Sequence, residues 1–321
     1  MEQLVFNEEL AYHEAPIGCH FFAETMAGPT LIRAGTTDQK KEYLPRILAG
    51  DITFCLGYTE PGAGSDLASL QTRARAGKDG YVINGQKMFI TLAQHADHCL
   101  LAARTDPEAP KHRGISLFIM NTKSAGITIR PTLTVGDMVV NEIFLDDVHV
   151  PRNALIGEEN HGWQYLGIAL DYERAFSAAA VGYLRRTLED LLQYVRDTRG
   201  DGKLLSNYPW IRHKLAQLAI ELEVGRMFGY RIAWLLEQGI VPFYEASIGK
   251  VFTSELERRL TSVGMELLGL YGQLKESSKW SPIEGRMERA YQIAFMVTIG
   301  GGTSEIQRSI IAIMGLGLPR N

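Results

Sequence analysis

The sequence has few cysteines and no long apolar run, and both absences narrow the class of protein. Its three cysteines, Cys19, Cys55 and Cys99, lie far apart and form no CxxC pair. We therefore expect buried, reduced thiols in a cytoplasmic protein and no disulfide framework. No apolar run approaches the roughly 18 residues that a membrane-spanning helix needs. The acidic start also lacks the basic and then apolar layout of a secretory signal.

The chain has no excess of positive charge. Its formal net charge is −4 at pH 7, and its lysines and arginines are scattered, which excludes the basic patch of a nucleic-acid-binding protein. The eight histidines show no spacing typical of metal ligands, so no metal site is expected. An apolar share of 45% over 321 residues is ordinary for a globular protein of about two domains.

The first fifty residues are predicted to be helical. Leu4, Val5, Leu10 and Ala11 recur with roughly helical spacing and should lie on one face. The pair Thr36 and Gln39 resembles a capping box that opens a second helix.

From Asp51 the pattern changes to short strands. Residues 70–76 alternate between apolar and polar, and Tyr81 to Ile83 leads into Asn84-Gly85, a strong hairpin-turn signal. Further strand candidates are Cys99–Ala103, Ile115–Met120, Ile127–Arg130 and Ile143–Leu145. Strands at this spacing predict a small antiparallel sheet or barrel, not βαβ units.

Beyond His161 the pattern is helical almost to the end. Long helices are expected at Trp163–Arg196, Trp210–Gln238, Pro242–Gly269 and Pro282–Val297, with a short one near Ser304. The predicted fold class is α+β, in three domains. These are an N-terminal helical domain (residues 1–50), a middle antiparallel β domain (51–158) and a C-terminal four-helix-bundle domain (159–321).

Two glycine-rich loops are the best clue to function. One runs from Tyr58 to Asp66 after a strand-like segment, and the other, Gly300 to Arg308, opens a helix. Loops of this kind suit close backbone approach to a large ligand with phosphates.

A Rossmann dinucleotide site is the first alternative for the loop at Gly62-Ala63-Gly64. The glycines do not have the spacing of that motif, because Leu67 stands where the third glycine belongs. No βαβ pattern follows either. The second alternative is a tight surface turn capped by Ser65 or Asp66, and taken alone the loop favours that turn.

The continuation of the sequence carries more information than either loop. The segments that matter occur in a fixed order: Tyr58–Asp66, Asn84–Thr91, Ala103–Thr105, Asp146–Pro151, Gly157–Trp163, Leu170–Arg174, Gly301–Arg308 and Leu316–Arg320. This ordered set, which covers nearly the whole chain from Glu8 onward, resembles the acyl-CoA dehydrogenase family.

The resemblance implies FAD bound between a β domain and a helical bundle, and it assigns residues one at a time. Tyr58 and Thr59 match positions that touch the flavin, and Ser65 matches one near the phosphates and the acyl-CoA chain. Phe89 stands where the family usually has tryptophan against the flavin ring. The remaining implied contacts are Thr91 near flavin N5, Gly302, Thr303 and Glu305 in the cofactor loop, and Asp171 and Arg174 along the CoA-binding wall.

The resemblance also implies the reaction, in which a carboxylate removes the α proton of the thioester while a hydride leaves the β carbon for flavin N5. Many members place this glutamate where the present chain has Gly301. The family's second arrangement, Leu-Asp-x-Glu-Arg as in isovaleryl- and long-chain-type enzymes, is present as Leu170 to Arg174, so Glu173 is the expected base. The Gly301 amide could still donate to the thioester oxygen. From the residues alone Glu173 is better explained as an ion-paired carboxylate on a helix surface, and the resemblance reverses that preference.

Two departures from the family pattern bear on assembly. The family usually has a further helical stretch before the point where this chain begins, and its arginine-rich Phe-Gly segment is replaced by Arg196 to Lys203. Arg199 is the remaining candidate for contact with a neighbouring subunit's FAD.

The leading interpretation is therefore an acyl-CoA dehydrogenase of fatty acid metabolism and β-oxidation, passing electrons to an electron-transfer flavoprotein. The resemblance implies a homo-oligomer, a dimer or tetramer, with a hetero-oligomer as the alternative assembly. The alternatives are a non-catalytic or partner-dependent subunit of a mixed oligomer, and a flavin oxidase or monooxygenase on the same fold. Branched, long or bulky acyl groups are the first substrates to try.

Overall fold

A computed structural model describes residues 1–18, 20–177 and 180–320, with backbone alone for residues 171–177. The chain folds into two compact units. The sheet unit comprises residues Ile17–Thr134 and Met138–Glu173, and the helical unit comprises Met1–Pro16, Val135–Asp137 and Arg174–Asn321. Within the described residues, no helix is both long and apolar enough to cross a membrane.

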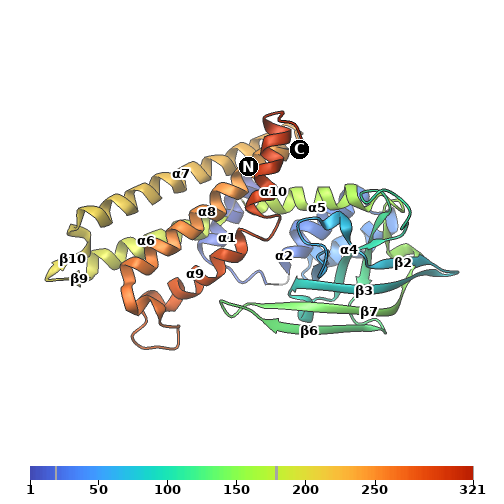
Figure 1. The fold of residues 1–321 in the computed structure, drawn as a ribbon, viewed down its shortest axis with the longest axis horizontal. Helices are drawn as coiled ribbons and strands as arrows, with labels where there is room; N and C mark the ends of the chain where they lie inside the picture. Colours follow the sequence, from blue (N-terminus) through green and yellow to red (C-terminus); the bar gives the residue numbers. More distant parts are fainter. Residues whose placement is uncertain (19, 178–179, 321) are drawn as a thin grey trace. The chain divides into compact units, whose positions relative to one another are not determined.

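The sheet unit is built on one eight-stranded sheet with the order β6-β7-β3-β2-β4-β5-β8, and β1 pairs with β4 (Figure 1). Most neighbours are antiparallel, and the parallel pairs are β1 with β4 and β2 with β4. The strands are β1 (Phe54–Gly57), β2 (Arg73–Ala76), β3 (Gly80–Thr91), β4 (His98–Arg104), β5 (Ile115–Asn121), β6 (Ile127–Leu133), β7 (Val139–Pro151) and β8 (Leu155–Ile156).

Both faces of the central strands are buried. On β4, Leu100 and Ala102 join one apolar cluster, while Cys99, Leu101 and Ala103 join another. This two-sided burial explains why β4 reads as a continuous apolar run. The first cluster is covered by helices, namely α2 (His20–Phe22), the π-helical turn Ala23–Ala27, α3 (Gly28–Ala34), α4 (Thr37–Leu48) and the start of α5 (Gly162–Ser177).

The predicted capping box is confirmed at the start of α4. The Gln39 amide donates to Thr36 Oγ1 at 3.2 Å, and the Thr36 amide donates to Gln39 Oε1 at 3.0 Å. The side chain of Gln39 also donates to the carbonyls of Asn153 and Leu155 at 2.7 and 2.9 Å. The same residue therefore caps the helix and ties it to the end of the sheet.

The Asn84-Gly85 pair does not form the predicted hairpin turn. Strand β3 continues through it, and the pairing with β7 shifts register between Ile83 and Gly85. Gly85 has a φ of 154°, and a Cβ there would lie 2.5 Å from Thr72 Oγ1. The glycine is therefore required by a bulge and by the close approach of Thr72, which precedes β2. The turn between β2 and β3 instead closes where the Gly77 amide donates to the Gly80 carbonyl at 2.7 Å.

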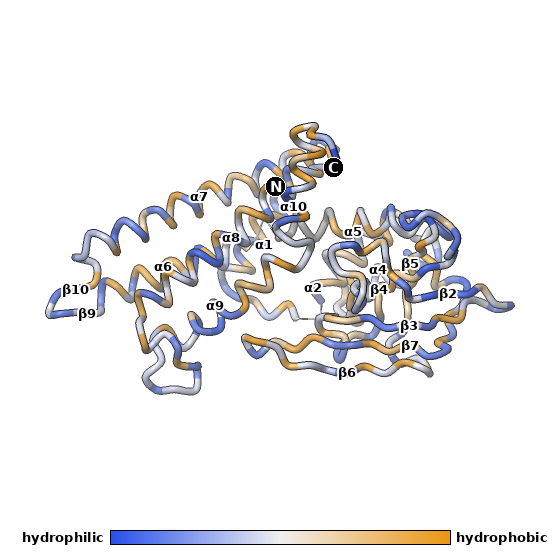
Figure 2. The backbone as a smooth tube through the Cα atoms, viewed as in Figure 1, coloured by the Kyte–Doolittle hydropathy of each residue, from blue (hydrophilic) through white to orange (hydrophobic). Residues whose placement is uncertain are grey.

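In the described part of the helical unit, helices α6, α7, α8 and α9 run alongside one another (Figure 1). Apolar and polar stretches alternate along them (Figure 2), and leucines of α6, α7 and α8 form the core. The elements are α6 (Val181–Asp197), the hairpin β9 (Arg199–Gly200) and β10 (Lys203–Leu204), α7 (Pro209–Glu237), α8 (Phe243–Leu268), α9 (Arg286–Val297) and α10 (Ser304–Ile310). The segment predicted as one helix, Trp163–Arg196, is divided between α5 and α6, and residues 178 and 179 lie outside the description.

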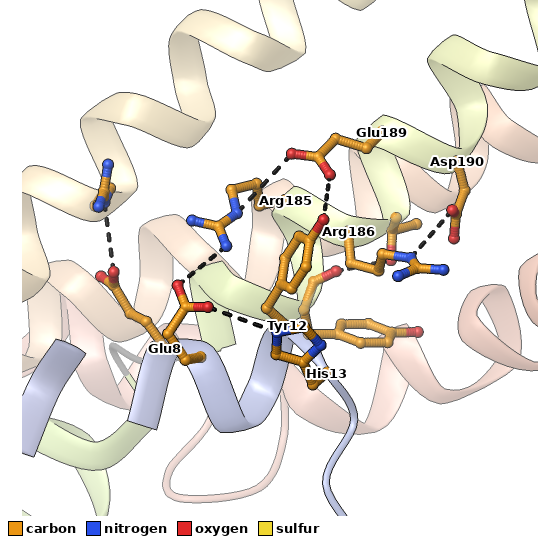
Figure 3. A network of polar contacts seen from close by, with 11 residues as sticks. Glu8, Tyr12, His13, Arg185, Arg186, Glu189 and Asp190 are labelled. Atoms are coloured by element: carbon orange, nitrogen blue, oxygen red, sulfur yellow. Dashed lines mark hydrogen bonds and ion pairs between the residues drawn. The ribbon is translucent and has the colours of Figure 1, made fainter. Parts of the chain in front are cut away.

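Helix α1 (Glu2–Tyr12) packs against α6 in the helical unit, and polar contacts hold it there (Figure 3). The Arg185 guanidinium lies 4.1 Å from the centroid of the Tyr12 ring. The Tyr12 hydroxyl donates to Glu189 at 2.6 Å. Aromatic and charged groups therefore lie between α1 and α6, where a simple amphipathic helix would have apolar side chains.

The apolar face predicted for α1 is consequently wrong. Val5 is 44% exposed, whereas Leu4, Asn7 and Glu8 are buried. Glu8 forms an ion pair of 3.4 Å with Arg226 on α7. Burial raises the pKa of Glu8, and Arg226 opposes that shift.

Candidate cofactor and substrate site

The first glycine loop follows β1 in the sheet unit and is closed by a tight turn. The Glu60 amide donates to the Ala63 carbonyl at 3.1 Å, and the Ala63 amide donates back to the Glu60 carbonyl at 3.1 Å. The Glu60 carboxylate turns toward the next segment and accepts the amides of Gln71 and Thr72 at 2.5 and 2.9 Å. One side chain therefore ties both ends of the loop together.

A buried ion pair lies beneath this loop. The ammonium of Lys87 on β3 donates to Glu60 Oε1 at 2.8 Å and to the Tyr58 carbonyl at 3.0 Å. The side chains of Lys87 and Glu60 are 0% and 6% exposed. Burial alone would raise the pKa of Glu60, but the Lys87 ammonium and hydrogen bonds from Thr72 and Gln71 hold it below its usual value. Burial lowers the pKa of Lys87, and Glu60 opposes that shift.

The same loop is tied to the stretch of β3 that carries Phe89. The Met88 amide donates to the Thr59 carbonyl at 2.9 Å. Phe89 has a φ of 60°, within the register shift between Lys87 and Ile90 in the pairing with β7. Phe89 as a whole residue is 59% exposed. A left-handed backbone at a bulky residue is strained. The contacts of the neighbouring residues must therefore stabilise this conformation, which leaves the Phe89 side chain exposed.

The predicted contacts Thr91 and Ser65 lie near these segments of the sheet unit. Thr91 ends β3 and pairs with Val140 of β7, and its side chain is partly exposed. Ser65 is exposed on the loop, next to Asp66. Asp66 forms an ion pair with Lys111 at 2.7 Å, and the hydrogen bonds from Lys111 and Ser69 lower the pKa of Asp66. The loop is therefore anchored on both sides of Ser65.

The second glycine loop lies in the helical unit, between α9 and α10. Gly301 and Gly302 have φ values of 66° and 94°. Gln307 donates from Nε2 to the Gly301 carbonyl at 2.8 Å, and the Lys250 ammonium donates to the Gly302 carbonyl at 2.7 Å. Thr303 caps α10, because its hydroxyl accepts the Ile306 amide at 3.3 Å.

Three consecutive backbone amides of this loop are free to bind a ligand. Among the described residues, the amides of Gly301, Gly302 and Thr303 donate to no protein acceptor. Successive amides in a glycine-rich turn form a concave donor site for oxygen anions.

Glu305 has the properties of a capping residue, not of a general base. It is exposed, and its own backbone amide and the Thr303 hydroxyl lower its pKa. A base that takes a weakly acidic proton near neutral pH needs a pKa raised toward the working pH.

Replacing Gly302 with alanine is expected to damage this loop. A Cβ at Gly302 would lie 2.6 Å from Gln307 Nε2 at a φ of +94°, so both backbone strain and displacement of Gln307 follow. Such strain costs about 1–3 kcal/mol, and we expect FAD binding to weaken about tenfold or more, measured by titration of the apoprotein. Gly239→Ala is the matched control, because Gly239 has a φ of +73° with nothing within 4 Å. Equal FAD affinity of Gly302→Ala and wild type would contradict the expected damage to the loop.

The predicted base and the two residues predicted along the CoA-binding wall fall on α5. Asp171, Glu173 and Arg174 belong to the backbone of that helix, and their side chains lie outside the described residues. Arg199 lies on β9, where its guanidinium donates to the Gly202 carbonyl at 3.0 Å. In this hairpin Arg199 is exposed and closes its own turn.

Each unit by itself fits a part of FAD. The sheet unit presents the exposed Phe89 ring, a face on which a flavin ring can stack. The helical unit presents the amides of Gly302 and Thr303, which suit phosphate or ribityl oxygens. A Cβ at Gly302 would come too close to Gln307 within that loop.

Four supporting residues were missed by the sequence analysis: Glu60, Lys87, Lys250 and Gln307. Lys87 offered only the general signal that a lysine inside a strand is costly to bury without a partner. Its partner Glu60 lies 27 residues away. Lys250 and Gln307 had no such signal, because a lysine or glutamine in a helix is usually solvent-exposed.

Comparisons with known proteins identify the family of the chain. The models of the acyl-CoA dehydrogenase N-terminal, middle and C-terminal domains match residues 1–51, 55–148 and 160–315. Acyl-CoA dehydrogenase FadE26 of Mycobacterium tuberculosis is 38% identical, covering 100% of this chain and 81% of the relative.

Two solved structures are similar over the whole chain. A variant of the Tcur3481–Tcur3483 steroid ACAD has a TM-score of 0.93 at 38% identity, covering 100% of this chain and 82% of the other. The ChsE4–ChsE5 complex from Mycobacterium tuberculosis has a TM-score of 0.92 at 38% identity, covering 99% and 82%. The chain therefore belongs to the acyl-CoA dehydrogenase family of FAD-dependent flavoenzymes.

Proposed function

We propose that this enzyme oxidises an acyl-CoA thioester to the 2-enoyl-CoA, with Glu173 as the base that removes the α proton. The observation that carries the assignment is that Gly301, in the C-terminal loop, has no side chain, while Leu170 to Arg174 supplies a carboxylate on α5. A general base must lie within hydrogen-bond reach of the proton that it removes. Sites built on helices position a functional group more precisely than sites built on loops.

The loop at Gly301 supplies the complementary donor. Its amide donates to no acceptor among the described residues, so it can bind the thioester oxygen and stabilise the charge that develops there when the α proton leaves. FAD, when bound, accepts the hydride from the β carbon. Tyr58, Thr59, Phe89 and Thr91 are proposed to hold the flavin ring.

The other ends of both ligands have proposed contacts as well. Gly302, Thr303 and Glu305 are proposed to bind the ribityl and phosphate region of FAD, and Asp171 and Arg174 to line the path of CoA. Ser65 is proposed to touch both ligands. Arg199 is proposed to reach the FAD of a neighbouring subunit.

A bulky acyl group is the proposed substrate class. Similar solved structures include a steroid ACAD, and the arrangement of Gly301 with Glu173 accords with branched, long or bulky acyl groups. An acyl-CoA whose chain is attached to a polycyclic ring is therefore the first compound to try.

The electron acceptor and the assembly are proposals of the same kind. An electron-transfer flavoprotein in the cytoplasm is proposed to reoxidise the enzyme. Acyl-CoA dehydrogenases form oligomers, and the ChsE4–ChsE5 structure is a complex of two kinds of chain. A related chain is accordingly the first partner to co-express, beside the homo-oligomer.

The proposal is tested by anaerobic titration of the purified flavoprotein with straight, branched and ring-bearing acyl-CoAs. We expect bleaching of the flavin absorbance by at least one bulky acyl-CoA and little by short straight ones. Bleaching by none, with the protein alone or with a related chain, would contradict the proposed activity. Rapid peroxide formation on admitting air would indicate an oxidase instead.

A further inference from the structure

Among the described residues, two polar contacts that attach α10 and the loop before it to α8 bear on the loop. At one, Arg308 on α10 forms a two-bond ion pair with Glu255, with distances of 2.7 and 2.9 Å. At the other, the Lys250 ammonium donates to the Gly302 carbonyl at 2.7 Å. The Arg308 side chain in the first contact is 55% exposed, whereas Lys250 in the second is only 6% exposed. The buried contact of Lys250 is therefore the one that restrains the backbone of the glycine loop.

Lys250 lies on a buried polar stripe of α8. The hydroxyls of this stripe are bonded within the helix: Ser247 donates to the Phe243 carbonyl, Thr253 to that of Gly249 and Ser254 to that of Lys250. These hydroxyls need no partner outside α8. The Lys250 ammonium, in contrast, extends from the helix to the glycine loop.

The contact fixes the direction of one ligand-binding amide. In a planar trans peptide the carbonyl and the following amide point to opposite sides. Holding the Gly302 carbonyl on Lys250 therefore directs the Thr303 amide away from α8. Gln307 has the same effect one residue earlier, because its bond to the Gly301 carbonyl directs the Gly302 amide.

The contact matters because the loop has little stiffness of its own. Three glycines in succession, Gly300 to Gly302, lack the side chains that restrict a backbone. Two of them hold positive φ angles. Hydrogen bonds to a charged donor are stronger than those between neutral groups, so Lys250 is the stronger of the two restraints on these peptides.

We propose that Lys250 is a positioning residue for FAD, which holds the Gly302–Thr303 peptide with its amide directed at the cofactor's oxygens. The inference rests on the proposed assignment of this loop to FAD. Lys250 acts through the loop in this account, and its charge adds attraction for the cofactor's phosphates at longer range.

The test compares the FAD affinity and the thermal stability of three variants. Lys250→Met removes the donor and keeps the length of the side chain, Lys250→Arg keeps a charged donor, and Arg308→Met breaks the other attachment of α10. We expect Lys250→Met to raise the Kd for FAD of the apoprotein about tenfold or more, the usual worth of a charged hydrogen bond. Lys250→Arg should recover most of the affinity, and Arg308→Met should change it less than about threefold.

Thermal stability separates positioning from general damage. Melting temperatures of the three apoproteins are expected to be similar, and amide hydrogen exchange in Gly301–Ser304 should be faster in Lys250→Met alone. Should Lys250→Met not fold, Lys250→Gln provides the neutral-donor comparison with Lys250→Arg, and lower FAD affinity of the glutamine variant is expected. Unchanged FAD affinity of the methionine or glutamine variant, or equal losses in Arg308→Met, would overturn the inference. A wild-type protein that does not bind FAD would instead contradict the proposed function.

Discussion

The Glu173→Gln variant is expected to bind FAD and acyl-CoA as the wild type does, but to lose reduction of the flavin by substrate. Glutamine has nearly the same shape and cannot accept the α proton. General bases contribute factors of about 10²–10⁴, so we expect the anaerobic reduction rate to fall about a thousandfold. Stopped-flow absorbance of the flavin after mixing with an acyl-CoA that bleaches the wild type measures this rate.

Two further glutamine variants serve as comparisons. Glu158 is a control, because its side chain is 80% exposed and lies 3.7 Å from His161; Glu158→Gln should reduce flavin at the wild-type rate. Glu305 is the rival carboxylate, and its lowered pKa and role at the start of α10 predict weaker FAD binding in Glu305→Gln. A wild-type rate in Glu173→Gln, with loss of reduction in fully flavinated Glu305→Gln, would move the base to Glu305.

The Lys87→Met variant is expected to lose much of the stability of the sheet unit. Glu60 would remain buried beneath the loop with no ion-pair partner, since Lys87 is the one described residue that forms an ion pair with it. Leaving one member of a buried ion pair alone costs about 3–5 kcal/mol. Urea unfolding followed by circular dichroism measures the loss of unfolding free energy. FAD binding should weaken as well, because the Tyr58 carbonyl and the loop lose their anchor.

The stability loss should depend on pH. In the wild type the pKa of Glu60 is lowered, so its contribution is present above the unfolded pKa and is lost as pH falls through the folded one. In Lys87→Met burial raises the pKa of Glu60 with no ammonium to oppose it. The variant then gains a proton as pH falls, and its deficit relative to wild type should shrink toward acid pH.

The control for Lys87→Met is the same substitution at an exposed pair of the same unit. Lys111 and Asp66 are 52% and 57% exposed, and exposed pairs contribute about 0–1 kcal/mol. Lys111→Met should therefore unfold close to wild type. Equal losses in both variants, or a Lys87→Met deficit that grows toward acid pH, would contradict this reading of the buried pair.

The sequence predicted the fold where one local pattern decides the structure. The apolar run predicted at Cys99–Ala103 lies in a strand buried on both faces, and the Thr36–Gln39 box opens α4. The Asn84-Gly85 turn was wrong because its glycine is required by the approach of Thr72, which lies on another segment. The face of α1 was wrong because Glu8 is paired with Arg226, 218 residues away.

The site was predictable to a similar extent. The ordered motifs identified both glycine loops, but not what holds them. The Glu60–Lys87 pair and the Lys250 contact with Gly302 join segments 27 and 52 residues apart, and no local spacing indicates such contacts. The left-handed backbone of Phe89 depends likewise on the bulge in the β3–β7 pairing.

The central claim is that one enzyme removes a proton from the α carbon and a hydride from the β carbon of an acyl-CoA. The most direct measurement is an anaerobic single turnover of the wild-type flavoprotein with a substrate deuterated at the α carbon or, separately, at the β carbon. Our account predicts one equivalent of 2-enoyl-CoA per flavin bleached, and slower bleaching with either label. Bleaching that is unaffected by both labels, or that yields no enoyl product, would contradict it.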